Sequence, residues 1–205
     1  LAGRLENGRI EGDAEREGIG VDRMVRDLLT LGLRAPGIRE IPGPHVVTTL
    51  TGATPDEAWM DWLAAFDHVE IPRNLRLLMA VRLLVDQLWL DEQALAPVIQ
   101  LPVDEARDVI DELVTITVRG SHLLAPGQGA PTDSAPVYTI AAPATELLSA
   151  YYAEHHRARP VPSRTTVARR YARARGRIST TELASLVGGN ASNMGTALRE
   201  LEADG

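Results

Sequence analysis

The feature of this sequence most suggestive of chemistry is a run of arginines in its last third. No acidic residue lies between His155 and Thr181, and the segment carries Arg157, Arg159, Arg164, Arg169, Arg170, Arg173, Arg175 and Arg177. A guanidinium group binds phosphate oxygens through paired, charge-assisted hydrogen bonds. The run therefore predicts sequence-independent, salt-sensitive affinity for nucleic acid. The alternative is that these arginines form a solvated helix face.

The residues that follow have the pattern of a helix-turn-helix. Ser179 and Glu182 have the spacing of a capping box, which starts a short helix. Gly188 and Gly189 then allow a tight turn, and Asn190 is a typical N-cap for a second helix. The expected buried stripe of this second helix consists of Met194, Ala197, Leu198 and Leu201. Its opposite face would present Ser192, Asn193, Gly195, Thr196 and Arg199, most of which are small enough to enter a major groove.

These two features together predict a DNA-binding surface. The side chains expected to contact double-stranded DNA are Arg169, Arg170, Arg173, Arg175, Arg177, Thr181, Ser192, Asn193, Thr196 and Arg199. The competing interpretation is a protein-binding surface, because many units of this kind bind proteins instead.

The charge distribution favours the first interpretation. Residues 151–205 hold nine arginines and five acids, a net charge of +4, whereas residues 1–150 hold twelve arginines and 23 acids, a net charge of −11. The net charge of −7 is therefore the sum of a negative N-terminal part and a positive C-terminal part. A chain divided in this way can bind phosphate at one end while its overall charge stays negative.

Other chemistry finds little support in the sequence. There is no cysteine, which excludes thiolate metal sites, disulfides and a cysteine nucleophile. The five histidines lack metal-ligand spacing, and no phosphate-binding loop or nucleophile motif occurs. We therefore expect neither an enzyme, a metal nor a cofactor. No apolar run approaches the roughly 20 residues that span a bilayer, so we expect no membrane partner. The lack of cysteine fits a reducing, cytoplasmic location, which we expect.

The preceding elements resemble a winged helix. Periodicity predicts helices over residues 72–89, 91–99 and 103–114, followed by a β-rich run at 115–118, a Gly/Pro tip at 124–136 and a return strand at 137–140. The third helix would turn Asp104, Glu105, Asp108, Asp111 and Glu112 outward, against a single Arg107. Because carboxylates repel phosphates, we expect this unit to pack internally or to form a dimer interface.

Upstream, residues 38–41 and 45–50 are expected to be strands, and Thr54 with Glu57 is expected to cap another helix. The stretch from Glu15 to Leu29, with Ile38 to Leu50, resembles the end of the RecG C-terminal-related, ATP-binding-like domain found in bacterial putative transcriptional regulators of the Schlafen/AlbA type. The resemblance implies that this domain precedes winged helices. Its last glycine box would map to Gly18 and Gly20, but the family's other nucleotide-binding boxes have no match here, so ATP binding is not expected.

The sequence thus predicts a mostly helical α+β chain, with tandem winged-helix and helix-turn-helix units after a short α/β N-terminal remnant. The expected parts are residues 1–52 as the end of the ATP-binding-like domain, 53–142 as a winged-helix unit, 143–162 as helix and linker, and 163–205 as the helix-turn-helix. The start at Leu1 and the stop at Gly205 suggest a piece of a longer protein, cut before a second wing. The expected function is the DNA-binding module of a homodimeric bacterial transcriptional regulator. A protein-interaction scaffold and a regulatory part of a nucleotide-dependent protein are the alternatives.

Overall fold

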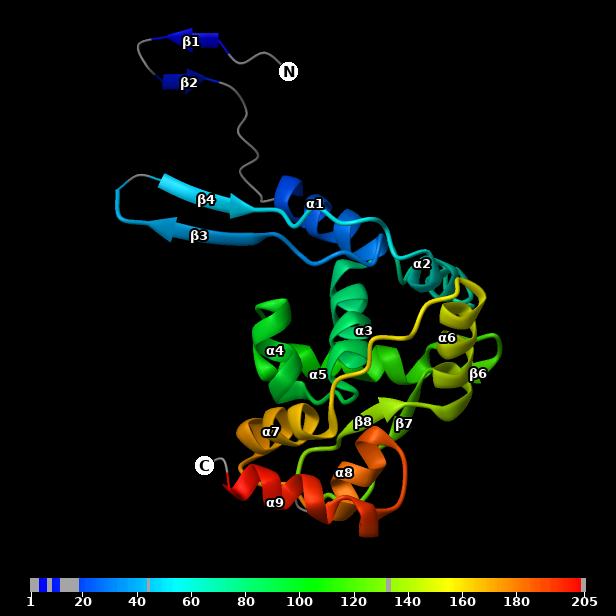
Figure 1. The fold of residues 1–205 in the computed structure, drawn as a ribbon. Helices are drawn as coiled ribbons and strands as arrows, with labels where there is room; N and C mark the ends of the chain where they lie inside the picture. The colour runs from blue at the N-terminus through cyan, green and yellow to red at the C-terminus, as the bar shows by residue number, and fades with distance from the viewer. Residues whose placement is uncertain (1–3, 7–8, 12–18, 44, 132–133, 204–205) are drawn as a thin grey trace.

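The computed structural model describes residues 4–6, 9–11, 19–43, 45–131 and 134–203 of the chain. Within them the fold is α+β and mainly helical, with small antiparallel sheets, so the expected fold class is confirmed at this level (Figure 1). Glu15 to Gly18 of the resemblance motif and the Asp204–Gly205 end lie outside the described residues. Strands β1 (Arg4–Glu6) and β2 (Arg9–Glu11) pair with each other.

The next elements are helix α1 (Ile19–Thr30) and an antiparallel hairpin of β3 (Gly37–Ile41) and β4 (His45–Thr49). Both strands lie close to their predicted bounds. Leu29 is the side chain of α1 that enters the main core, and its carbonyl accepts a hydrogen bond of 2.8 Å from Trp59 Nε1. Both faces of the hairpin are largely exposed, including Ile38 and Val46. The hairpin therefore contributes little to the core.

Helix α2 (Glu57–Ala64) begins two residues later than the Thr54 capping box predicts. Asp56 is the N-cap, and its carboxylate accepts a hydrogen bond from Trp59 N at 3.4 Å. The expectation at Thr54 was wrong because Asp56 has additional partners far along the chain. Tyr152 Oη donates to it at 2.6 Å and Arg157 Nη1 at 3.1 Å.

The main core forms where α2 meets α3 (Leu75–Gln87), α4 (Glu92–Ile99), α5 (Val103–Thr115) and α6 (Ala142–Glu154). Trp62 lies at its centre, in edge contact with Phe66 at 4.9 Å between ring centroids. Its indole nitrogen donates to the carbonyl of Ala144 at 3.2 Å, which fixes α6 against α2. By packing, α6 therefore belongs with the elements that precede it.

Short strands follow α5. β5 (Thr117–Val118) pairs with β6 (Ser121–His122), and β7 (Leu124–Pro126) pairs with β8 (Tyr138–Ile140). Leu90, between α3 and α4, forms a further antiparallel bridge with Tyr138, with reciprocal backbone hydrogen bonds of 2.8 Å. The segment between α3 and α4 thereby becomes a third, one-residue strand beside β8.

A second, smaller core lies at the other end of the molecule. It is built by α7 (Arg164–Arg175), α8 (Thr180–Val187), the 3-10 turn η1 (Ala191–Asn193) and α9 (Gly195–Ala203). We call the elements of the main core, α2 to α6, the first unit, and the elements from α7 to α9 the second unit. Three side chains of the first unit pack in this second core: Leu88, Trp89 and Val137. Trp89 meets Tyr171 edge to face, with ring centroids 5.0 Å apart. The two cores are therefore joined by buried side chains.

Candidate nucleic-acid interface

Helix α7 is positioned by signals at both of its ends. Ser163 Oγ caps its start by accepting from Thr166 N at 3.2 Å, and Gly176 ends it in the left-handed conformation with φ of 78°. Val167 and Tyr171 are buried on one face. Arg169 and Arg173 lie on the opposite face because a helix turns about 100° per residue, and both are exposed.

Arg175 and Arg170 both hydrogen-bond groups that lie outside the second core. Arg175 Nη1 pairs with Asp91, a fully buried carboxylate, and its Nη2 donates to Ala135 O at 2.8 Å. Only 11% of the Arg175 side chain is exposed. Arg170 is exposed, but its Nη1 donates to the carbonyl of Asp86 at 3.3 Å. The predicted arginine stripe is thus divided between an inner and an outer set.

Arg177 belongs to a third environment, at the start of α8. Its guanidinium lies 3.6 Å from the buried carboxylate of Glu182 and is 58% exposed. Glu182 completes the predicted capping box, accepting from Ser179 N at 2.7 Å while Ser179 Oγ accepts from Glu182 N at 3.2 Å. Tyr171 Oη donates to the same carboxylate at 3.1 Å. Burial, and then the charge of Glu182, raises the pKa of Tyr171 to about 12.

The turn and second helix follow the predicted pattern with one difference. Gly188 and Gly189 have φ of 73° and 112°, which glycine adopts without strain. Asn190 caps the next segment, its side chain accepting from Ser192 N at 3.2 Å. The first turn is a 3-10 turn, and the α-helix starts at Gly195. Met194 is fully buried and fixes this segment against the core.

The outer side of this segment is open. Ser192, Asn193, Thr196 and Arg199 are exposed, as predicted. Arg199 folds back along its own helix, with Nε donating to Gly195 O at 3.2 Å. Helix α9 lies at the end of the molecule opposite α1 and the β3–β4 hairpin, with α7 beside it (Figure 1). An elongated binding partner at α9 would therefore lie away from helices α1 and α2.

Thr181 lies against the loop that joins β7 to β8. Gly129 in this loop has φ of 84°, and a Cβ on it would lie 2.9 Å from Thr181 Cγ2. The adjacent Gln128 N donates to Ser185 Oγ at 2.8 Å. The tip of the first unit thus contacts α8 closely. No sequence pattern indicates this contact, because the two segments are more than fifty residues apart.

The acidic residues of α5 occupy the expected outward positions: Asp104, Glu105, Asp108, Asp111 and Glu112 are all exposed. Arg107 pairs with Glu92 on α4 through two hydrogen bonds, of 2.6 and 3.0 Å. This hydrogen bond to Arg107 lowers the pKa of Glu92 and raises that of Arg107. The outer face of α5 is exposed among the described residues, whereas Leu88, Trp89 and Val137 of the same unit pack in the second core. A dimer interface on this unit stays a prediction.

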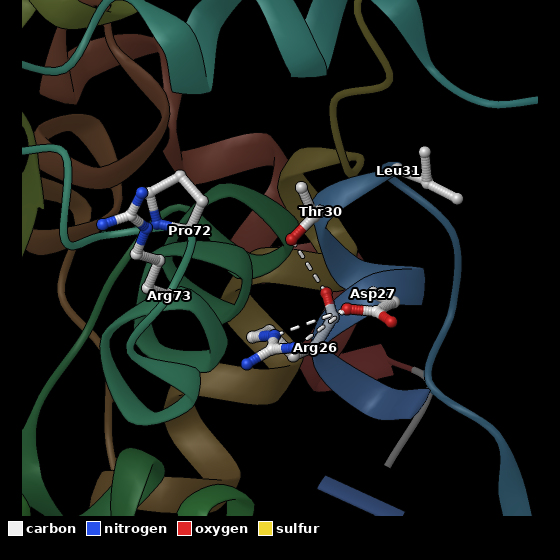
Figure 2. A pocket seen from close by; sticks show the side chains of 6 residues that line it. All are labelled: Arg26, Asp27, Thr30, Leu31, Pro72 and Arg73. Carbon is white, nitrogen blue, oxygen red and sulfur yellow. Dashed lines mark hydrogen bonds and ion pairs between the residues drawn. The ribbon is translucent and has the colours of Figure 1, made fainter. Parts of the chain in front are cut away.

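The described part of the chain has further surface hollows. One of about 650 Å³ lies between α1 and the segment before α3, lined by Arg26, Asp27, Thr30, Leu31, Pro72 and Arg73. In Figure 2, Arg26 pairs with Asp27 at 3.3 Å and Thr30 Oγ1 donates to the carbonyl of Arg26 at 2.9 Å, while Arg73 lies on the other side of the hollow. Among the described residues, no three His, Asp or Glu side chains are grouped to hold a metal ion.

No described helix is both long and apolar enough to cross a membrane. No protein-family model matches the chain, and no curated protein matches its sequence. Among solved structures, the crystal structure of the DIP2311 protein from Corynebacterium diphtheriae matches with a TM-score of 0.74 and 22% sequence identity. The match covers 93% of this chain and 34% of that one. The chain therefore shares its fold with about a third of that protein.

Proposed function

We propose that this chain is the DNA-binding module of a cytoplasmic bacterial transcriptional regulator, with the η1–α9 segment in the major groove. The observation that carries the proposal is the open outer side of η1 and α9, where small polar side chains lie beside an α7 that exposes arginines. Short polar side chains can approach base edges closely, and arginines beside them contact phosphates.

The arrangement of elements supports reading residues 75–140 as a winged helix and 164–203 as a helix-turn-helix. In the first unit, three helices are followed by the β7–β8 hairpin, and Leu90 pairs with the return strand as the first strand of a winged helix does. In the second unit, α8 and α9 both pack against α7, and a glycine turn joins α8 to the segment that leads into α9. We further propose that α1 and the β3–β4 hairpin are the last elements of an ATP-binding-like domain.

The proposed contact surface is smaller than the sequence alone predicts. It keeps Arg169, Arg173, Arg177, Ser192, Asn193, Thr196 and Arg199. Arg175 leaves the set because its ion pair with Asp91 is buried, and Arg170 because it faces the end of α3. Thr181 is exposed, but we leave it out because its methyl group lies beside Gly129 of the β7–β8 loop.

The test is duplex DNA binding at increasing salt. If arginines of α7 and α9 neutralise phosphates, the logarithm of affinity falls linearly with the logarithm of salt, with slope of about −0.9 per phosphate contacted. The double variant Arg173→Glu/Arg199→Glu should weaken DNA binding at least roughly tenfold. It should also make the salt slope shallower by about 2, because each substitution removes one phosphate contact. The matched control is Arg34→Glu with Arg39→Glu, the same charge change at exposed positions of the opposite end. Equal binding by both double variants would rule out this surface.

A partner-binding scaffold is the second candidate, because α5 presents five exposed carboxylates with the part-exposed Val103 and Val114. Two copies meeting through this face would bring like charges together, which is unfavourable. We therefore place the proposed homodimer contact elsewhere and expect a basic partner for α5. Failure to bind DNA at low salt, with capture of a basic partner that Asp108→Arg abolishes, would favour this function instead.

A further inference from the structure

A cavity of about 590 Å³ lies where the two cores meet. Its walls come from the end of α3, both strands of the β7–β8 hairpin, the first turn of α6, the linker before α7 and the end of α8. The volume is within the range of roughly 300–1,000 Å³ that small-molecule sites occupy. Because both units contribute walls, an occupant would contact both of them at once.

The linker places an unpaired arginine in this cavity. Arg159 Nε is buried without a hydrogen-bond partner, while the residue as a whole is partly buried, and no ion pair of Arg159 occurs within the part of the chain that the structure describes. Burial lowers the pKa of Arg159, yet a guanidinium stays charged at neutral pH. A guanidinium that is partly withdrawn from water without a counter-ion is less favourable than one in bulk water. Arg175, the comparable arginine at the same junction, has the buried carboxylate of Asp91.

The remaining lining indicates what would supply the missing negative charge. Leu88, Val161 and Leu186 offer apolar surface, whereas Glu146 is the acidic member of the lining. A single guanidinium balances one negative charge, and its planar donors match a carboxylate with two parallel hydrogen bonds. Glu146 disfavours a second negative charge in the same space. A dianionic phosphate therefore fits less well than a monocarboxylate with an apolar body.

We propose that this cavity binds a small monocarboxylic acid, with its carboxylate on Arg159 and its apolar part against Leu88, Val161 and Leu186. The site is independent of DNA binding. Because its walls belong to both cores, the bound acid adds stability to the packed junction between them.

The experiment is thermal denaturation and calorimetric titration of the chain with hexanoate, benzoate and inorganic phosphate as probes. Saturable stabilisation by a monocarboxylate is expected, with a shift of the melting temperature of roughly 5–10 °C at a hundredfold excess over Kd. Arg159→Met should abolish the shift and, without ligand, melt at or above the wild-type temperature, since it removes an unpaired buried charge. Arg164→Met removes the same charge from an exposed position of α7 and should keep the shift.

Val161→Trp provides a second variant that leaves the guanidinium in place. Val161 is 56% exposed, so the substitution can fold, but the larger ring fills the cavity and should weaken the monocarboxylate at least roughly tenfold. The proposal fails if no monocarboxylate binds saturably, if phosphate binds equally well, or if Arg159→Met binds like wild type. It also fails if Arg159→Met alone is destabilised, because the guanidinium would then already have a favourable partner.

Discussion

At the scale of single residues, arginines close together in the sequence have different surroundings. Arg173 is exposed on the outer face of α7, Arg175 pairs with buried Asp91 two residues later, and Arg159 is partly buried without a counter-ion. Asp91 is also the N-cap of α4, accepting from Ala94 N at 2.8 Å. One carboxylate thus starts a helix of the first unit and holds a helix of the second.

We expect Asp91→Asn to be strongly destabilising. Asparagine caps a helix about as well as aspartate, so the decrease in the free energy of unfolding comes from the ion pair rather than from the cap. Removing one charge leaves Arg175 buried and unpaired, which costs about 3–5 kcal/mol. Urea denaturation measures this, with Asp86→Asn as the control. Asp86 pairs with Arg82 at 2.9 Å on an exposed surface, where the loss should stay below about 1 kcal/mol. Similar losses in the two variants would mean that Arg175 relaxes into solvent.

At the scale of elements, α6 is the helix that fixes α2. The indole of Trp62 donates to the first turn of α6, and Tyr152 on α6 donates to the N-cap of α2. At the last turn, His155 Nε2 lies 2.7 Å from Asp61 and Nδ1 lies 3.3 Å from Glu57, both on α2. The hydrogen bond with Asp61, with the charges of Asp61, Glu57 and Glu154, raises the pKa of His155 against the opposing effect of burial.

This contact should make stability depend on pH. Because the pKa of His155 is higher in the folded state than in the unfolded state, the folded state binds the proton more tightly. The contribution is fully present below the unfolded pKa of about 6.5 and is lost as the pH rises through the higher folded value. The melting temperature of His155→Gln should therefore fall below that of wild type in acid and converge with it in alkali. His122→Gln, at an exposed position of β6, is the control. A constant difference at all pH values would contradict the ion-pair explanation.

At the scale of the whole molecule, the two cores are not independent. Trp89 leaves the first unit to pack in the second core, the β7–β8 loop lies on α8, and the ion pair of Asp91 with Arg175 closes the same junction. An interface of buried aromatic and ionic contacts transmits unfolding between units, whereas a solvated linker does not. The orientation of α9 relative to the first unit is therefore set by packing.

Trp89→Ala should break this coupling. Truncating a buried tryptophan costs about 3–5 kcal/mol, and the loss falls on the contact between cores. Wild type should unfold in one calorimetric transition with equal calorimetric and van't Hoff enthalpies, whereas Trp89→Ala should give two transitions. Trp59→Ala removes a tryptophan buried within the first core and should lower the melting temperature without splitting the transition. Two transitions in wild type would show that the units fold separately.

The sequence by itself determined the features that depend on near neighbours. The capping box of Ser179 and Glu182, the glycine turn and the cap at Asn190 lie where residue type and spacing predict them, because their partners are within a few residues. The outward carboxylates of α5 follow in the same way from helical period. The start of α2 could not be predicted in this way, because its N-cap Asp56 is bound by Tyr152 and Arg157, about a hundred residues away.

Only the tertiary structure decided which arginines stay outside. An arginine's environment depends on the group that faces it, and that group comes from another part of the chain: Asp91 for Arg175, the Asp86 carbonyl for Arg170, and none among the described residues for Arg159. Helical period fixes the side of α7 on which each guanidinium lies, but not what covers that side. Charge interactions act through space over a few ångströms, so sequence distance carries no information about them.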